Sequence, residues 1–181
     1  MTPVMVDGGW YANAGSFAYW PSALSDDKVL YSFHMYEPYE ATSSPNIKRD
    51  PQLRYPGVQT WLGAKQVTWN KATVKAFLDQ PYDWAAAHGV PASRMVAGEY
   101  GCVRQWVDCG AYLGDVLDAL DRHRAHWAFY SWREDGWDAM DYDLAPEVTS
   151  GQFYDLSGQG KADQIQRDPH PLLDVIEAHM N

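Results

Sequence analysis

Four short hydrophobic runs in the chain have the character of β-strands. Each is rich in β-branched or aromatic residues and ends in polar or glycine-containing sequence. The runs are residues 3–8 (PVMVDG), 29–36 (VLYSFHMY), 94–100 (RMVAGEY) and 126–132 (HWAFYSW). Helical patterns lie between the later runs, and this alternation of strand and helix predicts a parallel sheet.

Three segments repeat hydrophobic residues at the spacing of one buried helix face. Residues 110–124 show it most clearly, and residues 170–180, with proline in the first turn, are the last. The remaining helix is predicted to begin after Asn70, a good N-cap, to break at Pro81 and to end near Gly89. The expected inward-facing residues are Val74, Phe77, Leu78, Leu113, Val116, Leu117, Leu120, Leu172, Leu173 and Ile176.

Two long segments, residues 37–69 and 133–168, follow strand ends and are expected to be irregular. Residues 10–27, between the first two strands, show weak helical character at best. Loops of such length in a compact domain are usually lids or binding walls.

Length and charge limit the class of protein. The 181 residues are enough for one domain, 1–181, but too few for a complete barrel of eight strand–helix units, which needs about 250. A net charge of -10 with 14 Lys and Arg argues against a nucleic-acid partner. No apolar stretch approaches the roughly 20 residues that span a bilayer, and the opening residues lack the features of a signal peptide.

Aromatic residues and cysteines each leave two interpretations open. The nine Trp and twelve Tyr suit stacking on sugar rings, but such residues also fill ordinary cores. Cys102 and Cys109 form either a local disulfide, in a protein that matures outside the cytosol, or two free thiols.

Three predicted strand ends carry chemically useful side chains. The first has His34 and Tyr36, the second has Glu99, and the third has Trp132. In a parallel strand–helix array these ends lie on one rim, so the four side chains are expected to converge on one pocket. A lone histidine or tryptophan in a strand is usually part of the core, so the set is more informative than its members.

The motifs SFHMYEP, VAGEYG and WAFYSW, in this order, resemble the last third of the family 5 glycoside hydrolases, the cellulase-like retaining enzymes. The likeness covers most of the chain. It implies an α/β fold that is half of a TIM-type (β/α)8 barrel, with about four parallel strands and covering helices that correspond to strands five to eight. It also implies a carbohydrate substrate and a secreted protein.

The resemblance assigns roles to seven residues. Glu99 would be the nucleophile, with His34 and Tyr36 as contacts of the substrate and of Glu99. The implied sugar-binding residues are Trp132 beside the cleaved bond, Trp61 in the loop after the sixth barrel strand, and Asp7 and Trp10 after the fifth.

One element of the family pattern is missing. Family members carry a proton-donating Glu in an Asn-Glu-Pro motif, and this sequence contains none. Glu37, in MYEPY, already belongs to the motif of the preceding strand. Because retaining hydrolysis needs a proton donor as well as a nucleophile, reduced or altered activity is expected.

A second acidic set follows the last predicted strand. Its spacing does not match a calcium-binding EF-hand loop, and a solvated loop is the favoured interpretation. The residues are Asp135, Asp138, Asp141, Asp143 and Glu147. No cofactor is expected, and the alternative is a divalent metal near His34 and Glu99 that assists hydrolysis of a phosphate or other ester.

Four parallel strands without their barrel partners leave two unpaired edges and an open core. The sequence therefore predicts a homodimer or larger assembly in which two copies bring the strand count to about eight. Three functions remain open at this stage. They are a glycoside-hydrolase-like enzyme with Glu99 central, a hydrolase of another ester, and a non-catalytic carbohydrate-binding remnant.

Overall fold

A computed structural model of the chain describes residues 2–61, 65–133, 137–149 and 151–180. The side chain of Trp61 lies outside the described part. The fold is centred on a four-stranded parallel sheet with the order β1-β2-β5-β6, as the alternation of strands and helices predicted. Its strands are β1 (Val4–Asp7), β2 (Val29–Met35), β5 (Met95–Tyr100) and β6 (His126–Trp127).

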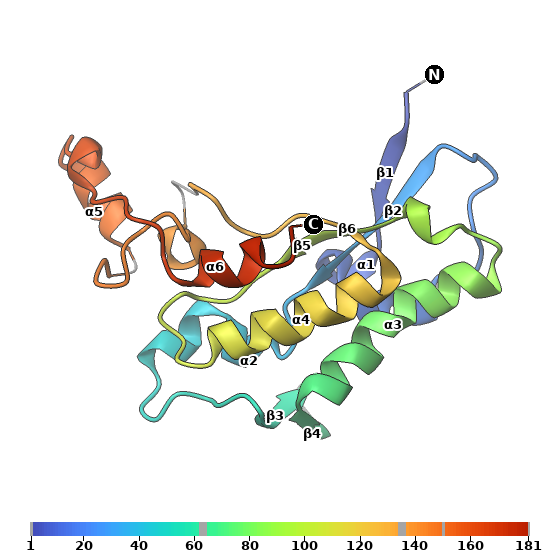
Figure 1. The fold of residues 1–181 in the computed structure, drawn as a ribbon, viewed down its shortest axis with the longest axis horizontal. Helices are drawn as coiled ribbons and strands as arrows, with labels where there is room; N and C mark the ends of the chain where they lie inside the picture. The colour runs from blue at the N-terminus through green and yellow to red at the C-terminus, as the bar shows by residue number, and fades with distance from the viewer. Residues whose placement is uncertain (1, 62–64, 134–136, 150, 181) are drawn as a thin grey trace.

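Two long helices cover one face of this sheet (Figure 1). They are α3 (Lys71–Ala87) and α4 (Cys109–His123), and all seven side chains predicted to point inward from them are buried. The sheet residues on this face, among them Tyr31, Phe33 and Ala97, are fully buried in the same hydrophobic cluster. The sequence pattern therefore located the core correctly.

The helix α3 differs from the prediction at Pro81, where it continues without a break. Proline cannot donate a hydrogen bond to the carbonyl four residues earlier, which usually ends or kinks a helix. Here Pro81, Tyr82 and Trp84 are all buried in the core, so packing of the second half of the helix outweighs the local loss. The Asn70 side chain caps the start by accepting a 3.0 Å hydrogen bond from the backbone N–H of Thr73.

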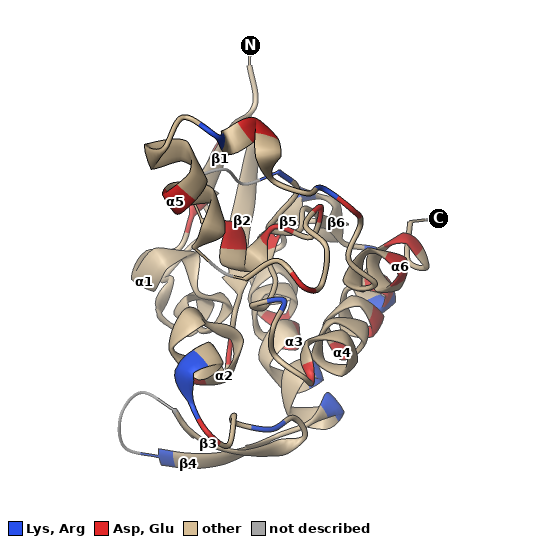
Figure 2. Ribbon diagram, turned by 90° about the vertical axis from the view of Figure 1, so that its left-hand side faces the viewer, with Lys and Arg blue, Asp and Glu red and all other residues tan. Residues whose placement is uncertain are grey.

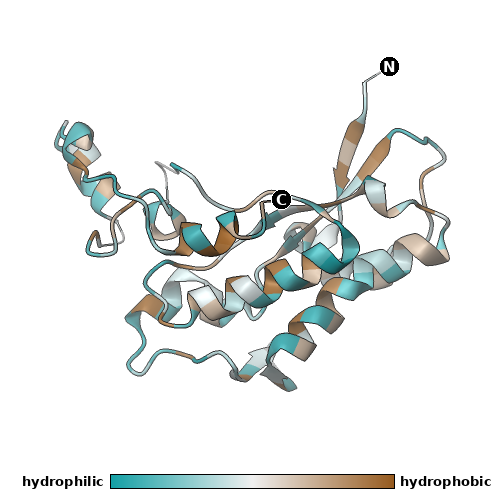
Figure 3. Ribbon diagram, in the orientation of Figure 1, coloured by the Kyte–Doolittle hydropathy of each residue, from teal (hydrophilic) through white to brown (hydrophobic). Residues whose placement is uncertain are grey.

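The opposite face of the sheet is only partly covered. Leu30 and Val96 are half-buried there, and Met5, which pairs with Leu30 from the edge strand β1, is 56% exposed. Figure 3 shows brown, hydrophobic segments on the two strands that lie near the N-terminus, β1 and β2. Parallel sheets normally have both faces covered. The element order and the half-open face match part of a TIM-type barrel.

The segments expected to be irregular contain short regular elements. A two-stranded antiparallel hairpin, β3 (Gly57–Trp61) and β4 (Lys65–Trp69), was not predicted, although β-branched and aromatic residues recur in both strands. The other short elements are α1 (Gly9–Ala12), η1 (Ala14–Tyr19), α2 (Tyr39–Thr42), η2 (Ser44–Lys48), η3 (Ala92–Arg94), η4 (Asp138–Met140), α5 (Gln152–Gly158) and η5 (Ala162–Gln164).

The last helix, α6 (Leu172–Glu177), packs against α4 with Leu172, Leu173 and Ile176 buried, as predicted. Figure 2 shows acidic residues on α4, α5 and α6 as well as around the sheet. Among the helices of the described residues, none is long and apolar enough to cross a membrane.

Cys102 and Cys109 are joined in a disulfide, and both are fully buried. The hydroxyl of Tyr142 closes this loop by accepting a hydrogen bond from the N–H of Cys102 at 2.9 Å and donating one to its carbonyl at 2.8 Å. The structure thus decides between the two states of the cysteines that the sequence left open.

Candidate active site

A broad cavity of about 1040 Å³ opens at the carboxyl ends of β1, β2 and β5. This is the rim at which a parallel strand–helix fold gathers chemistry from separate strands. The cavity brings together five of the seven site residues predicted from the sequence. These are Asp7, Trp10, His34, Tyr36 and Glu99.

An irregularity in β5 determines where Glu99 points. Ala97 pairs with Phe33 and Glu99 pairs with His34, so Gly98 is an extra residue on β5, a β-bulge. A Cβ at Gly98 would lie 2.5 Å from the Ser32 hydroxyl oxygen, so any other residue there would force the Ser32 side chain to move. The bulge places Glu99 beside His34 on the cavity side and sends Tyr100 into the core.

The carboxylate of Glu99 has two polar neighbours. One is His34 in β2, and the other is Tyr36, the first residue after β2. The hydroxyl of Tyr36 donates a hydrogen bond to Oε2 of Glu99 at 2.8 Å. The His34 Nδ1 lies 3.6 Å from the same oxygen. Burial, together with the hydrogen bond to Glu99, raises the pKa of Tyr36 well above its usual value, so this hydroxyl stays a donor at all relevant pH values.

The turn after β1 forms another wall of the cavity. Trp10 and Tyr11 both line it, and they are 57% and 97% exposed. The Trp10 ring rests edge-on against Tyr19 at a centroid distance of 5.2 Å. Aromatic rings that are exposed at a cavity wall suit the apolar faces of sugars.

Glu37 and Asn13 also line the cavity and were not predicted as site residues. Oε1 of Glu37 accepts a 2.9 Å hydrogen bond from Asn13 Nδ2, and Oε2 accepts a 3.0 Å bond from the N–H of Tyr39. Burial raises the pKa of Glu37, while the bonds from Tyr39 and Asn13 oppose that rise. The position of Glu37, one residue after a strand end, was the available sequence signal.

The structure does not place Trp132 in the cavity lining. Its side chain is half exposed, and the guanidinium carbon of Arg133 lies 5.4 Å from its ring centre. The aromatic residues of this segment that line the cavity are Tyr130 and Trp137. The expected run 126–132 forms a strand only to Trp127, so residues beyond it do not follow strand alternation.

The hairpin β3–β4 borders the cavity through Thr60. The neighbouring Trp61, which was predicted to line a sugar subsite, ends β3, and its side chain lies outside the described residues. Its role in sugar binding therefore stays a prediction.

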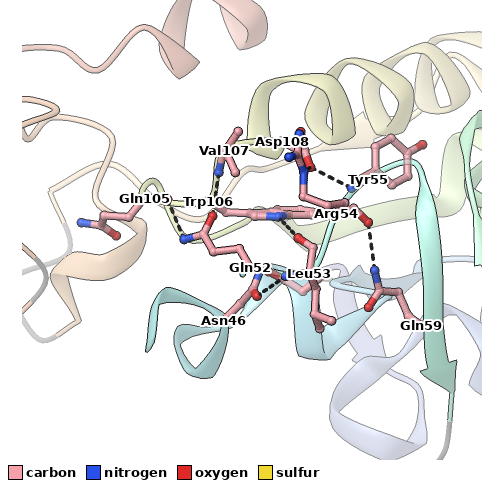
Figure 4. A network of polar contacts seen from close by, with 11 residues as sticks. Asn46, Gln52, Leu53, Arg54, Tyr55, Gln59, Gln105, Trp106, Val107 and Asp108 are labelled. Atoms are coloured by element: carbon pink, nitrogen blue, oxygen red, sulfur yellow. Dashed lines mark hydrogen bonds and ion pairs between the residues drawn. The ribbon is translucent and has the colours of Figure 1, made fainter. Parts of the chain in front are cut away.

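A network of polar contacts fastens the start of this hairpin to the disulfide loop (Figure 4). Arg54 donates to both oxygens of Asp108, at 2.6 and 3.0 Å, and the N–H of Tyr55 donates to the same carboxylate at 2.9 Å. The Trp106 indole donates to the carbonyl of Leu53 at 2.7 Å. The loop after β5 and the hairpin after β2 therefore form one connected wall.

The acidic segment after the last strand is not the solvated loop that the sequence favoured. Asp138, Asp141 and Asp143 are almost fully buried, whereas Glu147 is exposed and Asp135 lies outside the described residues. Arg167 binds Asp141 at 2.9 Å, Arg133 binds Asp143 at 2.8 Å, and Asp138 accepts bonds from two backbone N–H groups. These carboxylates stabilise the fold of their own segment.

Metal binding finds no support in the part of the chain that the structure describes. No group of three or more His, Cys, Asp or Glu side chains there is arranged to hold a metal ion. The buried aspartates are already engaged with arginines and backbone donors, so they do not provide the acidic rim that a metal-assisted ester hydrolase would need.

Comparisons with known proteins agree with the geometry. The sequence model of the family described as Cellulase (glycosyl hydrolase family 5) matches residues 2–136. No curated protein sequence gives a significant match.

Solved structures of similar fold include an endoglucanase with a TM-score of 0.56 at 19% identity, covering 77% of this chain and 42% of that one. The cellulose synthase subunit Z of Clostridioides difficile has a TM-score of 0.56 at 17% identity, with 83% and 47% covered. Endoglucanase Cel5A of Thermotoga maritima has a TM-score of 0.58 at 11% identity, with 83% and 46% covered. The chain thus spans less than half the length of these structures.

Proposed function

The chain belongs to the cellulase family, glycosyl hydrolase family 5, and we propose that its cavity binds a carbohydrate and hydrolyses a glycosidic bond with Glu99 as the nucleophile. A carboxylate can attack the anomeric carbon while the bond from that carbon to the leaving-group oxygen breaks. The leaving group departs, and water then hydrolyses the covalent glycosyl intermediate and frees the carboxylate. In this proposal the activity is reduced or altered because the proton-donating Glu of the family is missing from the sequence.

The observation that carries the proposal is the presentation of Glu99. Its side chain is 40% exposed, reaches the cavity, and is oriented by the Tyr36 hydroxyl. The Nδ1 atom of His34 lies 3.6 Å from Oε2 of Glu99, and His34 lines the same cavity, which supports a role in holding the sugar. The exposed aromatic rings of Trp10 and Tyr11, on another wall of the same cavity, provide surfaces on which a sugar ring stacks.

The proton donor limits the range of substrates. The sequence has no Asn-Glu-Pro motif, and general acid assistance commonly contributes about 10² to 10⁴ in rate. Substrates with good leaving groups need less assistance. We therefore expect this protein to cleave nitrophenyl or dinitrophenyl glycosides faster than unactivated glycans. The ratio of the two rates should be larger than in an enzyme that has both an acid and a nucleophile.

The test compares the variant Glu99→Gln with the unchanged protein on dinitrophenyl glycosides. Loss of turnover with unchanged thermal unfolding supports Glu99 as nucleophile, and full turnover in Glu99→Gln overturns it. The matched control is Glu147→Gln, because Glu147 is exposed and lies in another segment.

Sugar binding without turnover is the second candidate function, favoured by the exposure of Trp10 and Tyr11 at the cavity wall. Isothermal calorimetry with oligosaccharides distinguishes the two. Measurable affinity in a protein that cleaves no aryl glycoside would favour the binding function.

We also propose that a second copy of the chain completes the sheet. The edge strand β1 exposes Val4 and Met5, and the face bearing Leu30 and Val96 is only half-buried. In this assembly β6 of each copy pairs with β1 of the other about a two-fold axis. The result is a closed sheet of eight parallel strands that encloses the open face of each copy. The shared rim then holds the carboxylates of both copies.

Light scattering tests this assembly. The proposal expects a mass of about twice 20.5 kDa at micromolar concentration. The variant Met5→Lys should shift the protein to monomers, whereas Val58→Lys on the hairpin should not. A stable monomer of the unchanged protein rejects the second copy as the occupant of this face.

The buried disulfide supports a further proposal, that the protein matures in an oxidising compartment and is secreted. Titration of free thiols on protein freshly isolated from its natural source tests this, because reduced cysteines would contradict it.

A further inference from the structure

Three consecutive residues in the turn after β1 have left-handed backbone conformations. Trp10, Tyr11 and Ala12 have φ of 54°, 55° and 59°, and none of them is glycine. Residues with a side chain rarely adopt such a conformation, because their Cβ then lies too close to the following carbonyl oxygen. It persists only where surrounding contacts hold it, and such sites are concentrated at ligand-binding positions.

The contacts that hold this turn come from Asn13 and Glu37. The Asn13 side chain donates to Oε1 of Glu37 at 2.9 Å, and its own oxygen accepts a bond from the N–H of Gly15 at 2.8 Å. Oε2 of Glu37 accepts from the N–H of Tyr39 at 3.0 Å. Oε1 of Glu37 therefore connects the turn to the segment that follows β2, and the bond from Tyr39 to Oε2 holds the carboxylate within that segment.

The backbone of Asn13 adds a second link, since it forms a parallel bridge with His34. The turn is thereby attached beside a residue that contacts Glu99. Ala12 and Ala14, on either side of Asn13, are buried, whereas Trp10 and Tyr11 remain exposed at the cavity. The contacts fix the base of the turn and leave its aromatic rings free to meet a ligand.

We propose that Glu37 and Asn13 are positioning residues that hold the Trp10–Ala12 turn in its left-handed form, and that the rings of Trp10 and Tyr11 thereby determine how long a glycan the cavity prefers. The glycan as ligand rests on the proposed function. The strand β2 lies between β1, which leads into the turn, and β5, which carries Glu99. A sugar bound next to Glu99 therefore gains little from these rings, and further sugar units that extend along the turn gain more.

This assignment differs from a role for Glu37 as proton donor. A carboxylate that accepts bonds from Asn13 and from the N–H of Tyr39 is held as an acceptor by both oxygens. Loss of a proton donor affects poor leaving groups much more than good ones. Loss of a positioning residue affects both leaving groups equally, so kinetics separate the two roles.

The experiment measures kcat/KM for nitrophenyl and dinitrophenyl glycosides of one and of three sugar units. Asn13→Ala and Glu37→Gln should lower kcat/KM for the longer substrates by about 2- to 10-fold, the worth of one aromatic contact, chiefly through KM. The single-sugar substrates should change much less. Trp10→Ala should give the same length dependence, and Glu177→Gln, exposed on α6, should match the unchanged protein.

Two outcomes overturn the proposal. Equal losses for short and long substrates would show that the turn does not select length. A loss confined to nitrophenyl substrates and absent for dinitrophenyl substrates would make Glu37 the proton donor.

A measurement without turnover separates this proposal from the proposed function. Amide hydrogen exchange over residues 9–15 should rise in Asn13→Ala and Glu37→Gln but not in Glu177→Gln, while exchange in α4 stays unchanged. If no glycoside is cleaved, the proposed function fails. Amide hydrogen exchange and calorimetry with oligosaccharides still test whether Asn13 and Glu37 hold the turn. Unchanged exchange and affinity in both variants would reject it.

Discussion

The hydroxyl of Tyr36 donates a hydrogen bond to the Glu99 carboxylate across neighbouring strands at 2.8 Å. The two residues are 63 positions apart in sequence, and the parallel pairing of β2 with β5 brings them together. A fixed hydrogen bond to a reacting carboxylate selects its orientation before the substrate binds. Tyr36 is therefore central to how Glu99 is presented.

Replacing Tyr36 by Phe should lower kcat on an activated aryl glycoside about 10- to 100-fold, since a hydrogen bond to a charged group is worth about 1.5–3 kcal/mol. KM should change less because the ring remains. Steady-state kinetics measure the effect. Tyr154→Phe, exposed on α5, serves as the control, and an unchanged kcat in Tyr36→Phe would contradict the orienting role.

Replacing Asp141 by Asn should destabilise the protein by about 3 kcal/mol. Asp141 is 1% exposed and binds Arg167 at 2.9 Å, and removing the charge of Asp141 leaves the guanidinium with the more distant Asp143, at 3.6 Å. Urea unfolding measures the change. Glu147→Gln in the same segment should have almost no effect, and equal stabilities for the two variants would mean that the buried pair contributes nothing.

Acid should weaken the wall between the hairpin and the disulfide loop through Asp108. The Arg54 guanidinium is the main cause of the lowered pKa of Asp108, the N–H of Tyr55 adds to it, and burial opposes it. A carboxyl group with a lowered pKa stabilises the fold above its unfolded pKa of about 3.9 and loses that contribution as the pH falls below it.

The variant Asp108→Asn should therefore be less stable than the unchanged protein at pH 7, and the difference should shrink towards pH 3. Unfolding free energies over this range, with the exposed Asp174→Asn as control, provide the measurement. A difference that stays constant with pH would assign the effect to packing instead of charge.

Removing the disulfide with the double variant Cys102→Ser, Cys109→Ser should lower the free energy of unfolding by about 2–3 kcal/mol, the value for closing a short loop. Thermal unfolding with and without reductant checks it. In reductant, the stability of the unchanged protein should approach that of the double variant. If its stability is the same under reducing and oxidising conditions, the disulfide is not formed in solution.

Hydrophobic periodicity was sufficient to predict the sheet and its helices because each long element buries one continuous stripe. Val116 and Leu117, for example, repeat at helical spacing and are fully buried. The prediction at Pro81 was wrong because a local backbone preference was weighed without the packing of Tyr82 and Trp84 beyond it. Tertiary contacts supply what the local sequence cannot.

The cavity was predictable in part for a related reason. Strand ends locate His34, Tyr36 and Glu99, since the pattern fixes where each strand stops. Tyr130 and Trp137 follow a strand that stops early, and no periodic signal gives their direction. Asp138 and Asp141 were expected in solvent because their sequence is acidic, and the arginine that neutralises Asp141 lies 26 residues away.

The extra residue at Gly98 decides which face of the sheet the side chains of Glu99 and Tyr100 point to. Counted by simple alternation from Ala97, Glu99 falls on the side of the sheet that faces the helices, and Tyr100 on the side that faces the cavity. The glycine reverses this parity at the last step of the strand. The orientation of the acid is thus encoded in one extra backbone residue, Gly98, whose insertion turns the carboxylate of Glu99 to the cavity and the phenol of Tyr100 to the core.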